Sequence, residues 1–154
     1  MSFIATANPP LAADDAQVNN DRWFPAVDAK RARDVCRLDG TVTPPRLAHA
    51  IEAAMDTVNA ELRDYQAAQQ QAGITRLQDA GDGRQLGRYL RAIYAHVLAD
   101  MAEAYRDMDT TPSGEGKSER VRERLEARID EHRRALRWAI ADIKGQRRTT
   151  VELI

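Results

Sequence analysis

The chain has 154 residues and a formal net charge of −1, and it is 31% charged but only 5% aromatic. The near-zero total charge predicts neither a nucleic-acid-binding protein nor an acidic-tail protein. A chain of this length forms one domain that buries roughly 70% of its unfolded surface. Because helix-forming residues such as Ala, Leu, Arg and Glu are abundant, we expect an all-α protein.

The single cysteine and the absence of targeting patterns indicate the cellular compartment. Cys36 is the single cysteine, which excludes an internal disulfide bond and is typical of a reducing compartment. It lies in a short apolar pattern with Val27, Ala32 and Val35, so we expect it to be buried as a small hydrophobic residue. No signal-peptide pattern or membrane-spanning apolar stretch is visible, which predicts a soluble cytoplasmic product.

The N-terminal segment, residues 1–24, is predicted to be an extended arm because residues 1–22 show no hydrophobic period. Trp23 and Phe24 are two of the few large aromatic residues in the chain. Aromatic rings on such a segment usually dock, and two docking places are open: the chain's own core or a neighbouring subunit. A helical body over residues 25–146 and a C-terminal tail over residues 147–154 complete the predicted organisation.

The first two predicted helices follow the arm. A short helix is predicted over residues 28–38, with Asp28 as its cap. A long helix is then predicted to run without a break to Gly73, with the Thr43 hydroxyl as cap and Pro44 at the first helical position. Its apolar residues recur every three or four positions and predict one buried stripe: Leu47, Ile51, Ala54, Val58, Leu62 and Tyr65.

Two more long helices are predicted, one ending at Met108 and one running from Ser118 to Gly145. Tyr89, Tyr94 and Tyr105 lie beside the first stripe, where we expect exposed hydroxyls. Three long helices and one short helix, each with a single apolar stripe, predict an antiparallel helical bundle. The two stripes are Leu86, Leu90, Ile93, Val97, Met101, Ala104 and Met108, and Val121, Leu125, Ile129, His132, Leu136, Ile140 and Ile143.

The segment TPSGEGKS, residues 111–118, is close to the phosphate-binding pattern GxxxxGK[ST]. In that pattern backbone N–H groups surround phosphate oxygens, and a lysine reaches the terminal phosphates. Thr111 replaces the first glycine, and the segment follows an amphipathic helix instead of a buried strand. We therefore interpret it as a glycine-rich loop between helices, with nucleotide binding as the lesser alternative.

No catalytic residue, metal site or cofactor is predicted. His49, His96 and His132 lie on three different helices, and none has a second ligand at the spacing that helical metal sites use. His132 lies on an apolar stripe, so we expect it to be a core histidine. A nucleophile elbow is also missing from the sequence.

The charge is unevenly distributed. Residues 117–148 contain eleven Lys or Arg and six Asp or Glu, a balance of +5, which leaves −6 for the rest of the chain. A basic face exposed to solvent is the commoner meaning, and a head-to-tail ring is an alternative use of the asymmetry. The arginine-rich run before Trp138 also leaves open a cytoplasmic DNA-binding or regulatory protein.

The last six residues are β-prone, carry one charged side chain and end on an apolar residue. A tail of this kind is typical of a segment that docks on a partner. The predicted docking residues are Thr149, Thr150, Val151, Glu152, Leu153 and Ile154.

These segments together resemble the head completion protein (GPL) family of contractile-tailed phages, over roughly residues 23–154. The resemblance rests on RLDGTVTPPRL at residues 37–47, VNAEL at residues 58–62, RWAIADIKG at residues 137–145 and RRTTVELI at residues 147–154. Neither the composition nor the helical period requires these particular sequences.

The resemblance implies a structural virion protein without catalytic residues. Such a protein is a head–tail adaptor that forms a ring under the portal, extends the DNA channel and connects the head to the neck or tail. The implied partners are the portal protein, further copies of the chain in a twelvefold ring, the next neck or tail-completion protein, and DNA that passes without sequence-specific contacts. The implied location is the virion neck, after assembly in the host cytoplasm and without a membrane. Residues 149–154 would contact the portal or a neighbouring subunit, and Trp23 and Phe24 would dock the arm.

Overall fold

The computed structural model describes residues 17–108 and 115–148, with side chains described for residues 17–104 and 120–148. The protein is mostly helical, as the sequence predicts, with one small antiparallel sheet that the sequence does not predict. In chain order the elements are β1 (Gln17–Val18), β2 (Val27–Asp28), α1 (Ala29–Cys36), α2 (Pro44–Glu61), α3 (Arg63–Gln71), the 3-10 helix η1 (Leu77–Asp79), α4 (Gln85–Met108) and α5 (Glu115–Lys144).

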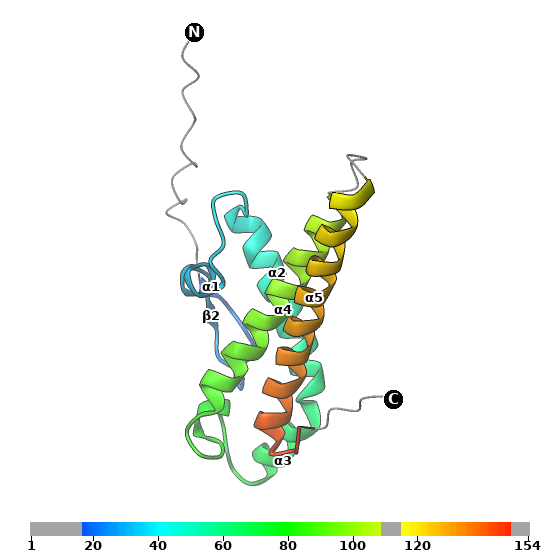
Figure 1. Ribbon diagram of the computed structural model, residues 1–154. Helices are drawn as coiled ribbons and strands as arrows, with labels where there is room; N and C mark the ends of the chain where they lie inside the picture. The colour runs from blue at the N-terminus through cyan, green and yellow to red at the C-terminus, as the bar shows by residue number, and fades with distance from the viewer. Residues whose placement is uncertain (1–16, 109–114, 149–154) are drawn as a thin grey trace.

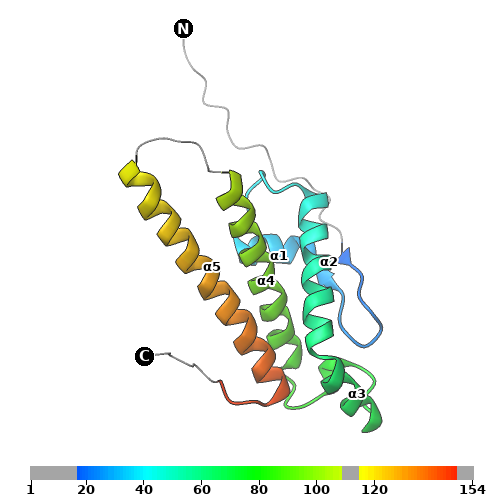
Figure 2. The same cartoon turned by 90° about the vertical axis from the view of Figure 1, so that its right-hand side faces the viewer.

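Helix α4 is the centre of the fold. It packs against α2 on one side and against α5 along the other, and successive long helices run in opposite directions (Figures 1 and 2). The short helix α1 crosses α4 and α2 instead of running along them (Figure 2). The fully buried core side chains come mainly from α2 and α4, which explains why α4 carries the most regular apolar stripe.

The prediction of one unbroken long helix up to Gly73 is wrong, because the helix is interrupted at Leu62. Helix α2 ends before this residue and α3 begins after it. Leu62 is fully buried, whereas α3 contains no buried residue and offers only Tyr65, which is partly buried against the core. Without a further apolar stripe, nothing holds α3 in line with α2. Gly73 does end α3, in the left-handed conformation at φ +84°.

The helix starts are only partly as predicted. Asp28 caps α1, since its side chain accepts a hydrogen bond from a backbone N–H of the first turn. Thr43 precedes α2, but its side chain makes no capping hydrogen bond, so that prediction is wrong. The loop before α2 is held instead by the buried Arg33 guanidinium, which donates to the carbonyl oxygens of Asp39 (3.1 Å) and Val42 (2.8 Å). Two prolines then begin the helix.

Residues 17–24 lie on the helical body. Trp23 and Phe24 are each only 3% exposed, and their rings meet edge to face at 4.8 Å in the chain's own core. The Trp23 indole N–H donates to the Ile74 carbonyl oxygen (3.2 Å), and the Phe24 ring stacks on Tyr89 at 5.3 Å. The sequence left two docking places open, the chain's own core and a neighbouring subunit. The two rings dock in the chain's own core.

The tyrosines of α4 differ from the expectation of exposed hydroxyls. Tyr89 is fully buried, and its hydroxyl donates to Asn59 Oδ1 (2.7 Å) and accepts from Asn20 Nδ2 (2.8 Å). The Tyr94 hydroxyl is also buried. The prediction failed at both positions because the N-terminal segment and α1 cover this side of α4, which the helical period alone does not show. The side chain of Tyr105 lies outside the described side chains.

Three residues of the predicted apolar patterns are exposed: Val35 (57%), Leu86 (37%) and Val121 (49%). His132 is half-buried, so its prediction as a core histidine is wrong. On α5, Ile129 is the first described residue that is buried, and Ile140 and Ile143 follow toward the C-terminal end. In Figure 2 the first half of α5 diverges from α4; of its apolar stripe, Val121 is exposed and Leu125 is half-buried.

Candidate interaction surfaces

The segment after α5 is fastened to the end of that helix. Arg148, the last described residue, makes a two-fold ion pair with Asp142, with Nε 3.0 Å from Oδ1 and the terminal nitrogen 2.6 Å from Oδ2. Its guanidinium also lies over the Trp138 ring, 5.3 Å from the centroid. The hydrogen bonds from Arg148 hold the pKa of Asp142 below its usual range. The predicted docking tail therefore begins from a fixed point.

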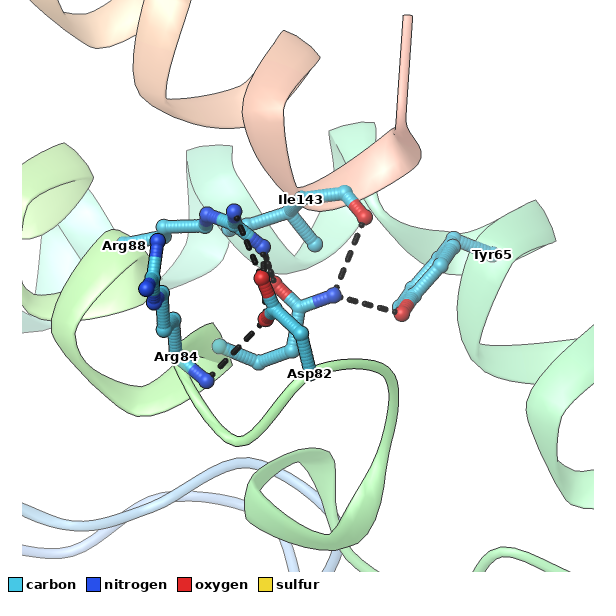
Figure 3. A network of polar contacts seen from close by, with 6 residues as sticks. Tyr65, Asp82, Arg84, Arg88 and Ile143 are labelled. Carbon is cyan, nitrogen blue, oxygen red and sulfur yellow. Dashed lines mark hydrogen bonds and ion pairs between the residues drawn. The ribbon is translucent and has the colours of Figure 1, made fainter.

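The end of α5 is itself tied to α3 and to the start of α4 (Figure 3). Gln85, which is 4% exposed, donates from Nε2 to the Tyr65 hydroxyl (3.0 Å) and to the Ile143 carbonyl oxygen (3.3 Å). Arg88 donates to the Gln85 side-chain oxygen (3.2 Å) and pairs with both carboxylate oxygens of Asp82 (3.0 and 3.1 Å). Since both donors of the buried amide are satisfied, this network orients the end of α5.

A groove of about 430 Å³ lies between α1, α4 and α5. Its apolar lining includes Leu90, Tyr94 and Leu98 of α4, and the exposed side chain of Val35 lies at its α1 wall. Charged and polar side chains border it: Arg31, Arg91 and His132. An apolar lining with a few polar groups is typical of a binding site.

The groove contains one unsatisfied polar group. The Tyr94 hydroxyl is buried, and no hydrogen-bond partner for it is found in the part of the chain that the structure describes. Burial raises the pKa of this phenol, so it is a neutral donor. A buried polar group without a partner costs about 1–3 kcal/mol, which a ligand that supplies an acceptor would recover.

Arg91 joins the groove to the fixed start of the tail. It lines the groove, and its terminal nitrogen lies 3.9 Å from Asp142 Oδ2, the carboxylate oxygen that Arg148 also contacts. The groove and the start of the tail are therefore neighbouring features of one surface. The tail residues themselves, 149–154, lie outside the described residues.

The predicted loop TPSGEGKS is in part helical. Helix α5 begins at Glu115, so residues 115–118 belong to its first turn and Ser118 is not its cap, which corrects the prediction. An acidic residue, Glu115, stands at the N-terminal end of the helix, where the helix dipole favours negative charge, and this offsets the poor helix propensity of Gly116. Residues 111–114 lie outside the described residues, and the preceding element is a helix, α4, instead of the buried strand that a phosphate-binding loop follows.

The histidines do not come together. Among the described residues no group of three or more His, Cys, Asp or Glu side chains is placed to hold a metal ion. His96 Nδ1 lies 3.1 Å from Asp100 Oδ2, and the hydrogen bond to Asp100 raises the pKa of His96. Burial, with a contribution from Arg128, lowers the pKa of His132. Folding therefore favours the protonated form of His96 and the neutral form of His132, so lowering the pH stabilises the fold through His96 and destabilises it through His132.

The described arginines within α5 are exposed, and they are distributed around the helix. The exposed members are Arg120, Arg122, Arg124, Arg128, Arg133, Arg134 and Arg137. Arg133 pairs with Glu103 of α4, and Arg134 lies over Trp138 at 6.0 Å from the ring centroid. Part of the charge therefore stabilises helix packing and stacking.

The residues that build these surfaces were mostly missed from the sequence. Tyr94 was placed beside the apolar stripe with an exposed hydroxyl, and neither Leu98 nor Gln85 was singled out. Asp142 and Arg148 are six positions apart, which is not a helical neighbour spacing. The useful signal was Gly145 between them, because a glycine that ends the helix at φ +66° lets the next residues fold back on its last turn.

The described residues thus form a small, mostly helical protein with an open groove beside α4 and an ion pair that holds the residues after α5. The chain matches the model of the phage head completion protein (GPL) family over residues 18–154, and it belongs to that family. It is similar to the head completion/stabilization protein of Escherichia phage P2, with 37% identity over 152 residues that cover 95% of this chain and 88% of the relative.

No solved structure matches the chain. Within the described residues no helix is both long enough and apolar enough to cross a membrane. The family resemblance read from the sequence is therefore confirmed by two comparisons.

Proposed function

We propose that the protein is a structural component of the phage virion that completes the head by forming a ring under the portal. In this role it extends the DNA channel and connects the head to the next neck or tail component. The observation that carries the proposal is the family match, which includes the helical body and the C-terminal segment. The fixed start of that segment at Arg148 supports it, because an anchored tail reaches a neighbour at a lower entropic cost than a free one.

In this proposal the helical body, residues 25–146, is rigid, and the two terminal segments make the contacts. The tail at residues 149–154 docks on the portal or on an adjacent subunit, and Trp23 and Phe24 fasten the end of the arm to the body. Many weak terminal contacts in a ring add up to a stable assembly. A twelvefold ring would match the portal, and DNA would pass through it without sequence-specific contacts.

Deletion of residues 149–154 tests the proposed tail contact. The truncated protein should bind purified portal-bearing heads with much lower occupancy than the full chain, measured by quantitative gel analysis of sedimented heads. Val121→Ser, at an exposed position of the body, is the matched control and should bind normally. Unchanged occupancy of the truncated protein would show that the tail is not the contact.

The proposed ring is templated, so the isolated protein should be mainly monomeric. Light scattering at micromolar concentration should give the mass of one chain, 17.3 kDa. A stable ring without portal would contradict templated assembly. Electron microscopy of heads that carry the protein then gives the number of copies.

The exposed arginines of α5 favour a second candidate, a DNA-binding or regulatory protein. That candidate requires affinity for duplex DNA that falls steeply with salt. Replacing Arg120, Arg124 and Arg128 by glutamine would lower such affinity. Absence of salt-sensitive binding by the unchanged protein would remove this candidate and leave the structural role.

A further inference from the structure

We propose that the groove between α1, α4 and α5 binds the chain's own C-terminal segment, residues 149–154, before the protein joins the head. This extends the proposed function, since the segment that docks on a partner after assembly would have a resting place beforehand. Four observations support it: the length of the segment, the apolar lining of the groove, the opposite charges of Glu152 and the bordering arginines, and the unsatisfied Tyr94 hydroxyl.

The reach is sufficient. The segment follows Arg148, whose carboxylate partner Asp142 lies 3.9 Å from Arg91 of the groove. Six extended residues span roughly 20 Å. The part of α4 that lines the groove, from Gly87 to Leu98, rises by roughly 16 Å. The segment can therefore run along the groove from its anchored start.

The apolar groups of the segment fit the lining. In an extended chain alternate side chains share a face, so Val151 and Leu153 point to the same side. That side would meet Leu90 and Leu98, and the half of Val35 that is now exposed would be covered. Removing such apolar surface from water contributes about 25 cal/mol per Å².

The polar groups are also complementary. With Val151 and Leu153 facing inward, Glu152 faces the border of the groove, where Arg31 and Arg91 carry positive charge. The backbone of an extended segment presents a carbonyl oxygen every other residue on each side, which supplies an acceptor for the Tyr94 hydroxyl. An occupant from the same chain is favoured over one from another copy because tethering raises its local concentration to the millimolar range.

The experiment measures paramagnetic broadening in the full chain. A nitroxide is attached to a Thr150→Cys variant, whose position 150 would face away from the groove. The native Cys36 should not react, because it is buried and its burial raises its pKa to about 11. The labelled, 15N-enriched protein is diluted into unlabelled protein, and the loss of amide signal is recorded at Val35, Leu90 and Leu98.

The expected result is loss of signal at these three residues that does not change on dilution. Val35→Glu and Leu153→Ser should restore the signals, whereas Val121→Glu, at a similarly exposed valine of α5, should leave the broadening unchanged. Arg31→Glu should weaken the effect, and Glu152→Lys in the same chain should restore it.

Two outcomes would overturn the proposal. One is the absence of groove broadening in the unchanged sequence, or broadening that persists in Val35→Glu. The other is broadening in a mixture of nitroxide-labelled 14N protein with unlabelled 15N protein, because it would place the segment of a second copy in the groove. Since no heads are used, either result is independent of the head-binding assay.

Discussion

The hydroxyl of Tyr89 donates to Asn59 Oδ1 at 2.7 Å, and the two residues share a third partner. Asn59 Nδ2 donates to Asn20 Oδ1 (2.9 Å), and Asn20 Nδ2 donates to the Tyr89 oxygen (2.8 Å). The three side chains thus close a ring of hydrogen bonds between the N-terminal segment, α2 and α4. Asn20 also holds the Pro25 carbonyl oxygen (3.0 Å), so the ring fixes the loop that carries the two buried aromatic side chains.

Tyr89→Phe should destabilise the fold by about 1 kcal/mol, because it leaves the Asn59 acceptor and an Asn20 donor without this partner in a partly buried place. The measurement is urea denaturation of the variant and the unchanged protein. Thr57→Val on α2, the helix that carries Asn59, is the control, since the Thr57 hydroxyl is exposed and bonds only the backbone of its own helix. A Tyr89→Phe protein as stable as the control would mean that the ring contributes nothing.

Arg148→Lys should free the start of the tail with little loss of stability. Exposed ion pairs contribute about 0–1 kcal/mol, and lysine cannot reproduce the two-fold contact or the stacking on Trp138. The chain has two tryptophans, and Trp138 is the one whose ring the Arg148 guanidinium covers, so a change in fluorescence would report Trp138. Arg76→Lys removes a similar pair with Asp79 and should leave the fluorescence unchanged. Identical spectra for both variants would contradict the stacking.

The two α4 and α5 histidines should give opposite pH responses. The raised pKa of His96 means that its stabilising contribution is full below its unfolded pKa of about 6.5 and is lost as pH rises through the higher folded value. The lowered pKa of His132 means that folding favours its neutral form, so that contribution is lost as pH falls below about 6.5.

Urea denaturation between pH 5.5 and pH 8, on the order of one unit either side of the histidine pKa, measures both effects. His96→Asn should abolish the gain in unfolding free energy that the protein shows toward pH 5.5. His132→Asn should abolish a loss of unfolding free energy in the same range. Both variants changing the pH profile in the same direction would contradict the assigned environments of the two rings.

Gly81→Ala should destabilise the connection before α4. Gly81 has φ +65°, a conformation that alanine adopts with strain, and an added Cβ would lie 2.7 Å from Gln85 Nε2. Gly87→Ala is the control because it lies in α4 with open space around its Cβ, so it should stabilise the protein by about 0.5–1 kcal/mol. In thermal unfolding, Gly81→Ala should lower the Tm and Gly87→Ala should raise it. Equal changes in Tm would contradict the role of the Gln85 network.

The helices were predictable from local signals. The spacing of apolar residues gave α4 from Leu86 to Met108, Asp28 gave the start of α1, and Gly145 gave the end of α5. Each of these depends on residues within a few turns of one another. The break at Leu62 was not predictable from the period because Leu62 continues the stripe, and what changes is the lack of a partner for α3.

The interaction surfaces were less predictable, since they depend on contacts between distant parts of the chain. The groove exists because α1 crosses α4 beside α5, and a helical period does not give a crossing direction. The buried state of Tyr89 depends on Asn20, which is 69 positions away and lies in a segment without any period. A docking tail at residues 149–154 was predicted from composition, whereas the Arg148–Asp142 pair depends on the turn after Gly145.

The described body begins at β1, which packs against α1 and α2, and ends at Arg148, which pairs with Asp142 of α5. Tension applied between these ends would pass through the Asn20 contacts, across α4 and through the Arg148 pair. An exposed ion pair contributes only about 0–1 kcal/mol, so the Arg148 pair would separate before the helices unwind. The contacts at the two ends would then separate first, while the packed core between α2, α4 and α5 keeps its shape.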